Sequence, residues 1–520
     1  MGPNYKWVVM VIVMLGMIMA MLDSSIVNVS IPAIMADFGS NITDIEWVVT
    51  AYMLAFAVLM PLTAWLRDRV GHKLLYSASL LVFTVGSLFC GLAWNLPTLI
   101  AARVIQALGG GAMSPTGLAM IAEAFDPQER GKAMGFFGMG IIIGPAIGPT
   151  LGGFLTMAFG WRSIFLVNLP VGILTVILAL ELLVHDRPHH LQKRPFDVWG
   201  FVFLSIFLLS FLLGISKGEQ EGWTSRYIMI CASLSAFGFI SFLITESLVK
   251  DRIMDLGLFK YPIFSVSMLI SAIRSVALFG GIFLLPLFLQ QLKGLTAIQS
   301  GLMLLPGTLV IALVMPIVGW LSDKSSPRFL TFTGMLLLIY SMYLYRHISI
   351  YMSNWDIIYP TIIRGIGMAM LMAPIMTLAL NAVPRRKAGM ASSMMSVIQQ
   401  VGGAIGIAIL STVLDSRAKF HMMAIGSTLK ANTPGFTSVM QGLQNRIHEL
   451  GFTHLGAVTA ARSILFKHIY IAGTSFAFQD AFLFAMGLIM LSLVPVFLLP
   501  KKPLTKHPEE IVPKGVVLVD

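Results

Sequence analysis

The sequence predicts an all-α protein that crosses a membrane many times. Hydrophobic residues form 57% of the 520 residues and charged residues only 11%, whereas a soluble domain carries about 25% charged residues. Apolar runs of about twenty residues, long enough to cross a bilayer as helices, recur along the whole chain. Too little polar surface therefore exists to cover a water-exposed globule.

The apolar runs predict fourteen spans. The first run is too long for the core of a signal peptide and has no convincing cleavage site, so we interpret it as an uncleaved span. We place the spans near residues 7–29, 46–66, 74–94, 98–121, 133–156, 162–184, 198–216, 226–249, 263–290, 298–321, 330–348, 357–381, 389–413 and 479–499.

Basic residues predict the orientation of the chain. They lie mainly in alternate loops, which the positive-inside rule assigns to the cytoplasm, together with both termini of a multi-pass protein of the cell membrane. The net charge of +11 is then a topological bias and predicts a lipid bilayer, not nucleic acid, as partner. The two cysteines, Cys90 and Cys231, define neither a disulfide framework nor a metal site, and we expect no cofactor.

The chain repeats itself. "MPLTAWLRDRVGHK" (Met60–Lys73) aligns with "MPIVGWLSDKSSPR" (Met315–Arg328), with Met, Pro, Trp, Leu and Asp identical at a constant offset. Each copy ends the second span of a six-span set. Paired halves are typical of alternating-access carriers, which bind substrate between the halves near the midplane. We predict a six-helix half at 1–185, two inserted helices at 186–262, a second half at 263–500 and a cytoplasmic tail at 501–520.

One outer segment is long, about 411–478. Its later part has the apolar spacing of helices, as in "QGLQNRIHEL". We expect either a structured cap lying on the membrane surface or a docking site for a partner protein.

A carboxylate lies inside the first span. Insertion of Asp23 into hydrocarbon is unfavourable by ~2.5–3.5 kcal/mol. Asp23 lies about six residues below the outer end of its span, and Arg103 of the fourth span about five, so at ~1.5 Å per residue both are roughly 8–9 Å deep. We predict that they approach one another, either as an ion pathway or as a static pair. Arg103 could instead extend to the outer surface.

Small residues form a ridge on the fifth span. Gly140, Gly144, Gly148 and Gly152 recur every four residues, which allows a neighbouring helix to approach closely. Pro145 interrupts the hydrogen-bond ladder and allows a bend.

The second half carries Arg274 and Arg364 in the ninth and twelfth spans, but no acidic residue near the middle of any span. We expect each arginine to pair with carbonyls, an anionic substrate group or water, or to tie helices together. An adaptable substrate cavity needs apolar walls and a few polar groups. Further candidates for its wall are Asn28, Gln106, Gln290, Gln399 and Gln400.

Four motifs together resemble the major facilitator superfamily, specifically its fourteen-span drug:proton antiporters, over essentially the whole chain. "AWLRDRVGHK" resembles the signature G-x-L-x-D-R-x-G-R-K, and "RVIQALG" resembles R-x-x-Q-G-x-G. "GIIIGPAIGP" resembles the antiporter motif G-x-x-x-G-P-x-x-G-G, with Pro149 in place of a Gly. "LDSSIVNVSIP" resembles the span-1 signature L-D-x-T-I-V-N-V-A-L-P of this branch.

The resemblance implies a major facilitator fold and a proton-coupled antiporter, driven by the proton gradient, that exports amphipathic drugs or toxic compounds. Asp23 would carry the coupling proton and Arg103 would tune it. A periplasmic adaptor protein would be a partner if the cell is Gram-negative. The resemblance also implies a cytoplasmic gate, for which simple anchoring by basic residues is the alternative; its residues would be Asp68, Arg69, Gly71, Lys73 and Asp323.

Two other functions compete with drug export. An exporter of the same fold could carry one physiological substrate, such as a fatty acid, bile acid, lysolipid or siderophore. A membrane enzyme or channel is disfavoured, because the sequence shows no P-loop, metal-ligand cluster or nucleophile–base constellation, and because a channel would not require repeated halves with gate motifs.

Overall fold

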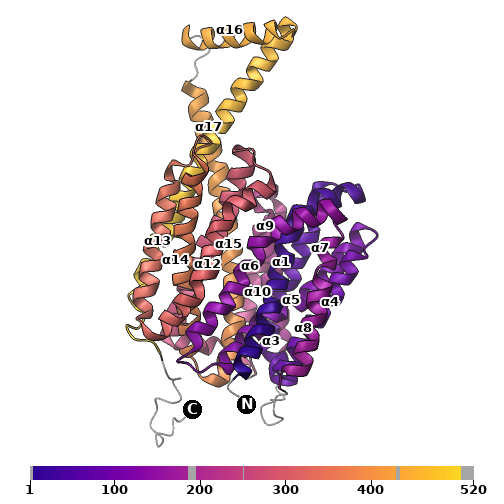
Figure 1. Cartoon of the computed structure of the whole chain (residues 1–520), viewed down its shortest axis with the longest axis vertical. Coiled ribbons are helices and arrows are strands. Elements are labelled where there is room, and N and C mark those ends of the chain that lie inside the picture. Colours follow the sequence, from indigo (N-terminus) through magenta and orange to yellow (C-terminus); the bar gives the residue numbers. More distant parts are fainter. Residues whose placement is uncertain (1–3, 185–194, 250, 429–433, 505–520) are drawn as a thin grey trace, which may run out of the picture.

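A computed structural model describes residues 4–184, 195–249, 251–428 and 434–504. Within these ranges the chain is helical, and the helices run roughly parallel to one long axis (Figure 1). The start of α1 and the end of α18 lie at the same end of the bundle, which we call the inner end. The opposite end is the outer end.

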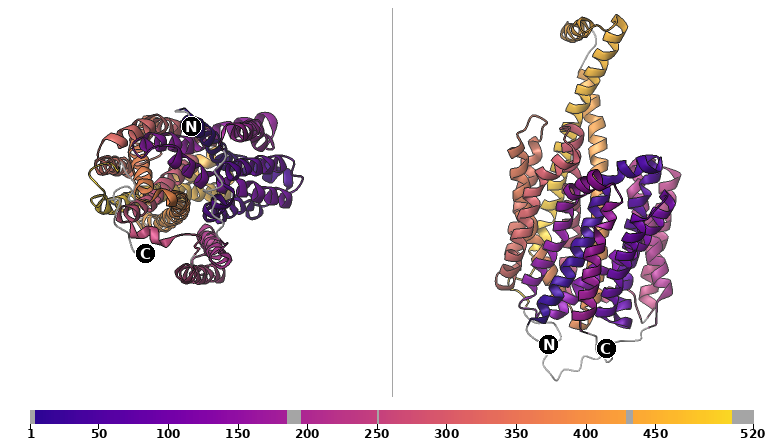
Figure 2. Two further views of the ribbon diagram at one scale, coloured as in Figure 1. Left: turned by 90° about the horizontal axis from the view of Figure 1, so that it is seen from below. Right: turned by 45° about the vertical axis from the view of Figure 1, so that its right-hand side comes forward.

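The first predicted half forms one group of helices (Figure 2). The predicted sixth span is divided at Val167 into α7 and α8. The helices are α1 (Tyr5–Phe38), α2 (Ile42–Ile45), α3 (Trp47–Val70), α4 (His72–Gly91), α5 (Leu96–Ala124), α6 (Arg130–Phe159), α7 (Ser163–Leu166) and α8 (Asn168–Leu182).

The inserted pair, α9 (Val198–Glu221) and α10 (Arg226–Leu248), packs at the periphery, with α9 against α3 and α15. The second half follows. Its helices are α11 (Pro262–Leu287), α12 (Ala297–Lys324), α13 (Pro327–Leu344), α14 (Asn354–Asn381), α15 (Ala388–Thr428), α16 (Pro434–Glu449), α17 (His454–Leu491) and α18 (Leu493–Val496).

Thirteen helices of the described residues are long and apolar enough to cross a membrane. The predicted ninth span coincides with α11 and the π-helical turn after it, where the described apolar stretches are the shorter Pro262–Val276 and Phe283–Leu292. The fourteenth span therefore stays a prediction.

The two halves meet mainly along α6 and α12, and where α15 contacts α3 and α5. Small residues allow the first contact: a Cβ built at Gly135 of α6 would lie 2.5 Å from the carbonyl oxygen of Met315 on α12. On the other side, the hydroxyls of Thr63 (α3) and Ser393 (α15) are 2.8 Å apart. The interface between halves is therefore closely packed on both sides.

The expected cap on the membrane surface is wrong. Instead, α15 and α17 continue past the predicted limits of the outer segment, 411 and 478, and extend beyond the neighbouring helices, with α16 lying across their tip (Figure 1). A helix satisfies its own backbone hydrogen bonds, so it need not end where hydropathy falls at Asp415 and Arg417.

Candidate functional site

Asp23 is the centre of a buried polar cluster in the first half. Its side chain is fully buried, and its Oδ2 accepts a hydrogen bond of 2.5 Å from Nη1 of Arg103. Oδ1 accepts from Nε2 of Gln106 at 2.7 Å and from Nδ2 of Asn168 at 2.8 Å. The predicted approach of Asp23 and Arg103 is confirmed, although α1 runs to Phe38 instead of ending near Val29.

Arg103 is held by more than its ion pair. Its Nε donates to the carbonyl oxygen of Val48 at 3.3 Å, and Nη1 donates to Oε1 of Gln106 at 2.6 Å. The guanidinium lies 3.9 Å from the ring centroid of Tyr52, within the range of a cation–π contact. Arg103 is 1% exposed, so it does not extend to the surface.

Gln106 belongs to this cluster and is no cavity wall in this conformation, because it is fully buried and bonds Asp23, Arg103 and Ser87. Its position three residues after Arg103 places both on one helix face, a signal that the sequence offered. Asn168 and Ser87 were not predicted. Asn168 was visible as an amide inside an apolar run, but its direction depends on how α8 packs.

Asp23 acts only as a hydrogen-bond acceptor in this cluster. All three of its side-chain partners donate hydrogen bonds, and an ionised carboxylate only accepts them. A proton on either oxygen would turn one acceptor into a donor facing another donor. Protonation would therefore break at least one bond that joins α1 to α5 or α8.

The glycine ridge of α6 positions the helix that carries Asp23. A Cβ at Gly144 would lie 2.5 Å from the backbone nitrogen of Leu22, and one at Gly148 would lie 2.7 Å from Ser25. At Gly140 the nearest atoms would be 3.8 Å away, an ordinary contact. Helix α6 is continuous through Pro145.

Asp323 joins the two halves at the inner end. Its carboxylate, on the last turn of α12, accepts from the backbone N–H groups of Gly131 at 2.7 Å and Lys132 at 2.9 Å. These are among the first N–H groups of α6, which have no partner within the helix. The carboxylate also lies at the positive end of the α6 dipole.

The first copy of the gate motif is arranged differently. Asp68 accepts from Nε of Arg67 at 2.9 Å, and a Cβ built at Gly389 of α15 would overlap the Arg67 guanidinium. Asp68 is thus connected to the second half indirectly, because its partner Arg67 lies against Gly389 of α15. Gly71 has φ +85°, which a residue with a side chain rarely adopts.

The other predicted gate residues lie beside this turn. Lys73 is buried, and the guanidinium of Arg69 lies 5.2 Å from the Trp65 ring centroid. The anchoring and gating interpretations of these two side chains both stay predictions.

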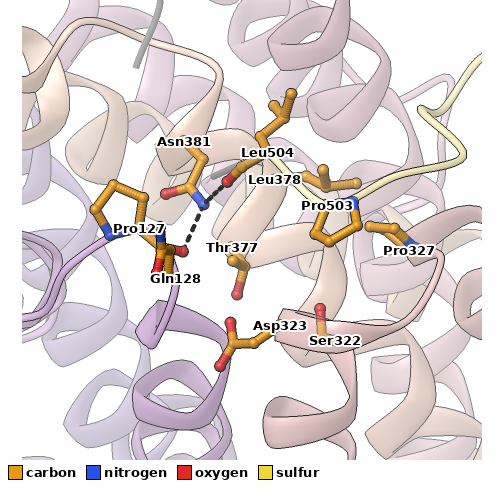
Figure 3. A pocket seen from close by; sticks show the side chains of 10 residues that line it. All are labelled: Pro127, Gln128, Ser322, Asp323, Pro327, Thr377, Leu378, Asn381, Pro503 and Leu504. Carbon is orange, nitrogen blue, oxygen red and sulfur yellow. Dashed lines mark hydrogen bonds between the residues drawn. The ribbon is translucent and has the colours of Figure 1, made fainter. Parts of the chain in front are cut away.

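Asn381 closes a second contact beside Asp323 (Figure 3). Its Nδ2 donates to the carbonyl oxygens of Leu504 at 2.8 Å and Pro127 at 3.2 Å, and its Oδ1 accepts from Arg130. The segment after α18 therefore lies against both halves at the inner end.

Asp255, between α10 and α11, ties the segment after the inserted pair to the short turn Arg385–Lys387 that precedes α15. Its Oδ2 accepts from Nζ of Lys387 at 2.8 Å. Burial alone would raise the pKa of Asp255, but the hydrogen bond and charge of Lys387 and the N–H of Gly257 hold that pKa below its ordinary value.

The remaining cavity candidates are not gathered in one place. Asn28 is exposed and, among the described residues, donates to the Ser24 carbonyl of its own helix, and Gln290 is exposed in a π-helical turn after α11. Arg364 is partly buried on α14. Arg274 and Gln399 lie close together, because both hydrogen-bond to the hydroxyl of Ser271.

The chain is similar in sequence to several known transporters. A multidrug resistance protein B homolog of Mycobacterium tuberculosis is 32% identical and covers 94% of this chain and 89% of its own. The multidrug export protein EmrB of Escherichia coli is 30% identical, over 92% of this chain and 94% of its own. The riboflavin transporter RibZ of Clostridioides difficile is 34% identical, over 78% of this chain and 88% of its own.

The fold is also shared with solved structures. The crystal structure of the human organic anion transporter MFSD10 (TETRAN) matches with a TM-score of 0.61, at 14% identity, over 95% of this chain and 100% of that one. The family model of the Major Facilitator Superfamily matches residues 13–407. With its paired halves and many apolar spans, the chain belongs to the major facilitator superfamily, whose members are membrane transporters.

Proposed function

We propose that this transporter is a proton-coupled antiporter that exports amphipathic drugs or toxic compounds by alternating access. The observation that carries the proposal is the buried Asp23, whose carboxyl oxygens accept hydrogen bonds from Arg103, Gln106 and Asn168. Ionisable groups at membrane depth mark proton relays. Relatives named for multidrug resistance support export of drugs.

The cycle follows from what a proton does to the cluster. A proton that enters from outside neutralises Asp23 and weakens its bonds to α5 and α8. The first half then repacks, the drug leaves outward and the halves reorient. When Asp23 faces the cytoplasm, Arg103 and the two amides again favour the carboxylate, so the proton leaves and drug binds.

The inner end would act as the cytoplasmic gate. Asp323 binds the start of α6 in this conformation, and these bonds must break before the halves separate there. Both termini would then lie in the cytoplasm of a bacterial cell. A periplasmic adaptor would meet the outer end, if the cell is Gram-negative.

Drug-stimulated proton release from liposomes tests the proposal. We expect release with the native protein and none with Asp23→Asn, because an amide cannot give up the coupling proton. Asp37→Asn is the matched control: it makes the same change on the same helix, at a carboxylate that is exposed and pairs with Arg162. Normal release from Asp23→Asn would reject the coupling role.

The second candidate is an exporter of one physiological substrate, favoured by the similarity to a riboflavin transporter. Competition decides between the two functions. If unrelated cationic and neutral compounds inhibit one another's export, the drug exporter is supported; if only close analogues of one compound compete, the narrow exporter is.

A further inference from the structure

Arg274 is a buried cation whose donors are largely unused. It lies on α11, twelve residues from the helix start, which at about 1.5 Å per residue is roughly 18 Å from the inner end and so near the midplane. Its side chain is 4% exposed. Nη2 donates to Oγ of Ser271 at a long 3.4 Å, and Nε and Nη1 have no partner among the described residues.

This arrangement is energetically incomplete. A guanidinium stays protonated in proteins and carries five N–H donors. An uncompensated buried charge is costly, and the other buried arginines of the described residues have such partners: Arg67 bonds Asp68, Arg103 bonds Asp23, and Arg130 bonds Asn381 and the Ala122 carbonyl. Arg274 has neither a carboxylate nor a backbone carbonyl as hydrogen-bond partner among the described residues.

The neighbours of Arg274 are also donors. Nε2 of Gln399, on α15, donates to the Ser271 hydroxyl at 3.4 Å. Ser271 is 1% exposed, and the hydroxyl of the neighbouring Ser275 already donates to the Ser271 carbonyl at 2.9 Å. Two helices thus bring a guanidinium, an amide and one hydroxyl together, a set that matches the acceptors of an oxyanion.

Gln399, which α15 contributes to this donor set, lies on a helix face that meets the first half. Gln399 lies seven residues after Ser392, and residues seven apart share one helix face. Ser392 donates to the Pro115 carbonyl of α5 at 2.9 Å, so that face of α15 looks toward the first half. Carriers of this architecture bind substrate at such an interface, near the midplane.

We propose that Arg274, Gln399 and Ser271 bind the oxyanion headgroup of an amphiphilic substrate, a carboxylate, sulfate or phosphate. The proposal rests on the proposed exporter function and names the substrate class. The donors are mostly buried here, so the headgroup reaches them when the halves separate. A guanidinium at the midplane also repels a cationic headgroup, so the site favours anionic amphiphiles.

Binding to the full-length protein in nanodiscs tests the proposal. The probes are octanoate, octyl sulfate and octyl phosphate against octyltrimethylammonium and octyl glucoside, which share one tail. We expect the native protein to bind at least one anion about tenfold or more tightly than the cation and the neutral probe, since a hydrogen bond to a charged group is sufficient for that ratio. The order among the three anions identifies the headgroup.

Variants then assign the preference to the site. Arg274→Met should remove the preference and keep affinity for octyl glucoside, and Arg274→Lys should keep part of it. Gln399→Leu, which leaves the charge in place, should reduce it. Arg346→Met removes one exposed cation outside the site and should change nothing.

Two results would overturn the proposal: a native protein without preference for any anion, including one that binds no probe, or an Arg274→Met protein that keeps the preference. Asp23→Asn separates this proposal from the coupling role, because it should lose coupled export yet bind octyl sulfate as the native protein does. If coupled export is absent but the anion preference is present, the anion site is supported and the exporter function is not. If coupled export is present but the anion preference is absent, the exporter function is supported and the anion site is not.

Discussion

The two predicted halves are both helical, but their buried charged residues are paired differently. In the first half, Asp23 and Arg103 neutralise one another within a hydrogen-bonded cluster. In the second half, α11 carries Arg274 at the position of the helix that holds Asp23, and that cation lacks an anionic partner among the described residues. The two predicted halves therefore differ in how their buried charges are paired.

This difference suggests a division of work between the halves. The Asp23–Arg103 ion pair can respond to a proton without any ligand, because protonation of Asp23 removes the charge that Arg103 pairs with. An unsatisfied cation requires something from outside the chain. We therefore propose proton coupling for the first half and recognition of a charged headgroup for the second, and four predictions test this comparison of the halves.

The largest effect is expected on uphill transport. Asp23→Asn should abolish drug accumulation driven by a pH gradient yet retain drug-for-drug exchange, which needs no proton. Arg274→Met should keep gradient-driven accumulation of a neutral substrate. Everted vesicles loaded with labelled drug measure both modes, and loss of coupling in Arg274→Met would contradict the division.

The next effect concerns stability. Arg103→Met leaves Asp23 buried without its cation, and removal of one partner of a buried pair destabilises by about 3–5 kcal/mol. Arg274→Met leaves no described carboxylate behind, so its unfolding free energy should stay equal or rise. Thermal unfolding in detergent compares the two; a larger loss for Arg274→Met would show that Arg274 is a structural tie.

Packing should respond alike in both halves. Gly144→Ala sets a Cβ 2.5 Å from the Leu22 nitrogen, and Gly406→Ala sets one 2.6 Å from the Val276 Cα. Overpacking of this kind costs about 1–3 kcal/mol. Gly140→Ala, with 3.8 Å of room, is the control. Thermal unfolding should give two destabilised variants and one native-like variant; equal stability of all three would contradict these close helix contacts.

The smallest effect is expected at the inner end. Asp323→Asn removes a charge from the start of α6, worth about 0.3–1 kcal/mol, whereas Asp68→Asn affects α15 only through Arg67. Asp323→Asn should therefore open the inner end more. Spin labels at Gln128→Cys and Ser326→Cys, in a background without Cys90 and Cys231, measure the separation. A wider opening in Asp68→Asn would reverse the assignment.

How much the sequence predicted depended on the kind of signal. Asp23 and Arg103 were matched because charge is costly in hydrocarbon and depth follows from helix rise. Asn168 and Ser87 were missed because neutral polar side chains carry no such penalty, and their direction depends on how α8 and α4 pack. Gln106 was placed in a cavity because its type, and not its spacing from Arg103, was weighed.

The outer segment was misjudged for another reason. Hydropathy reports where a helix leaves the membrane, not where it ends. Charged residues such as Asp415 and Lys419 marked the exit, but the Arg417–Asp480 ion pair continues the α15–α17 pairing beyond it. Only the packed structure shows that α15 and α17 stay paired beyond that point.

Because α15 is one continuous helix, it connects the interface between the halves with the outer end. At about 1.5 Å per residue its 41 residues measure roughly 60 Å, twice the ~30 Å hydrocarbon core. The same helix contacts the first half at Ser392 and passes Gln399, and its partner α17 packs against α16 beyond the neighbouring helices. A fluorophore on exposed Val439 of α16 would therefore report a movement of the paired helices α15 and α17 from outside the bundle.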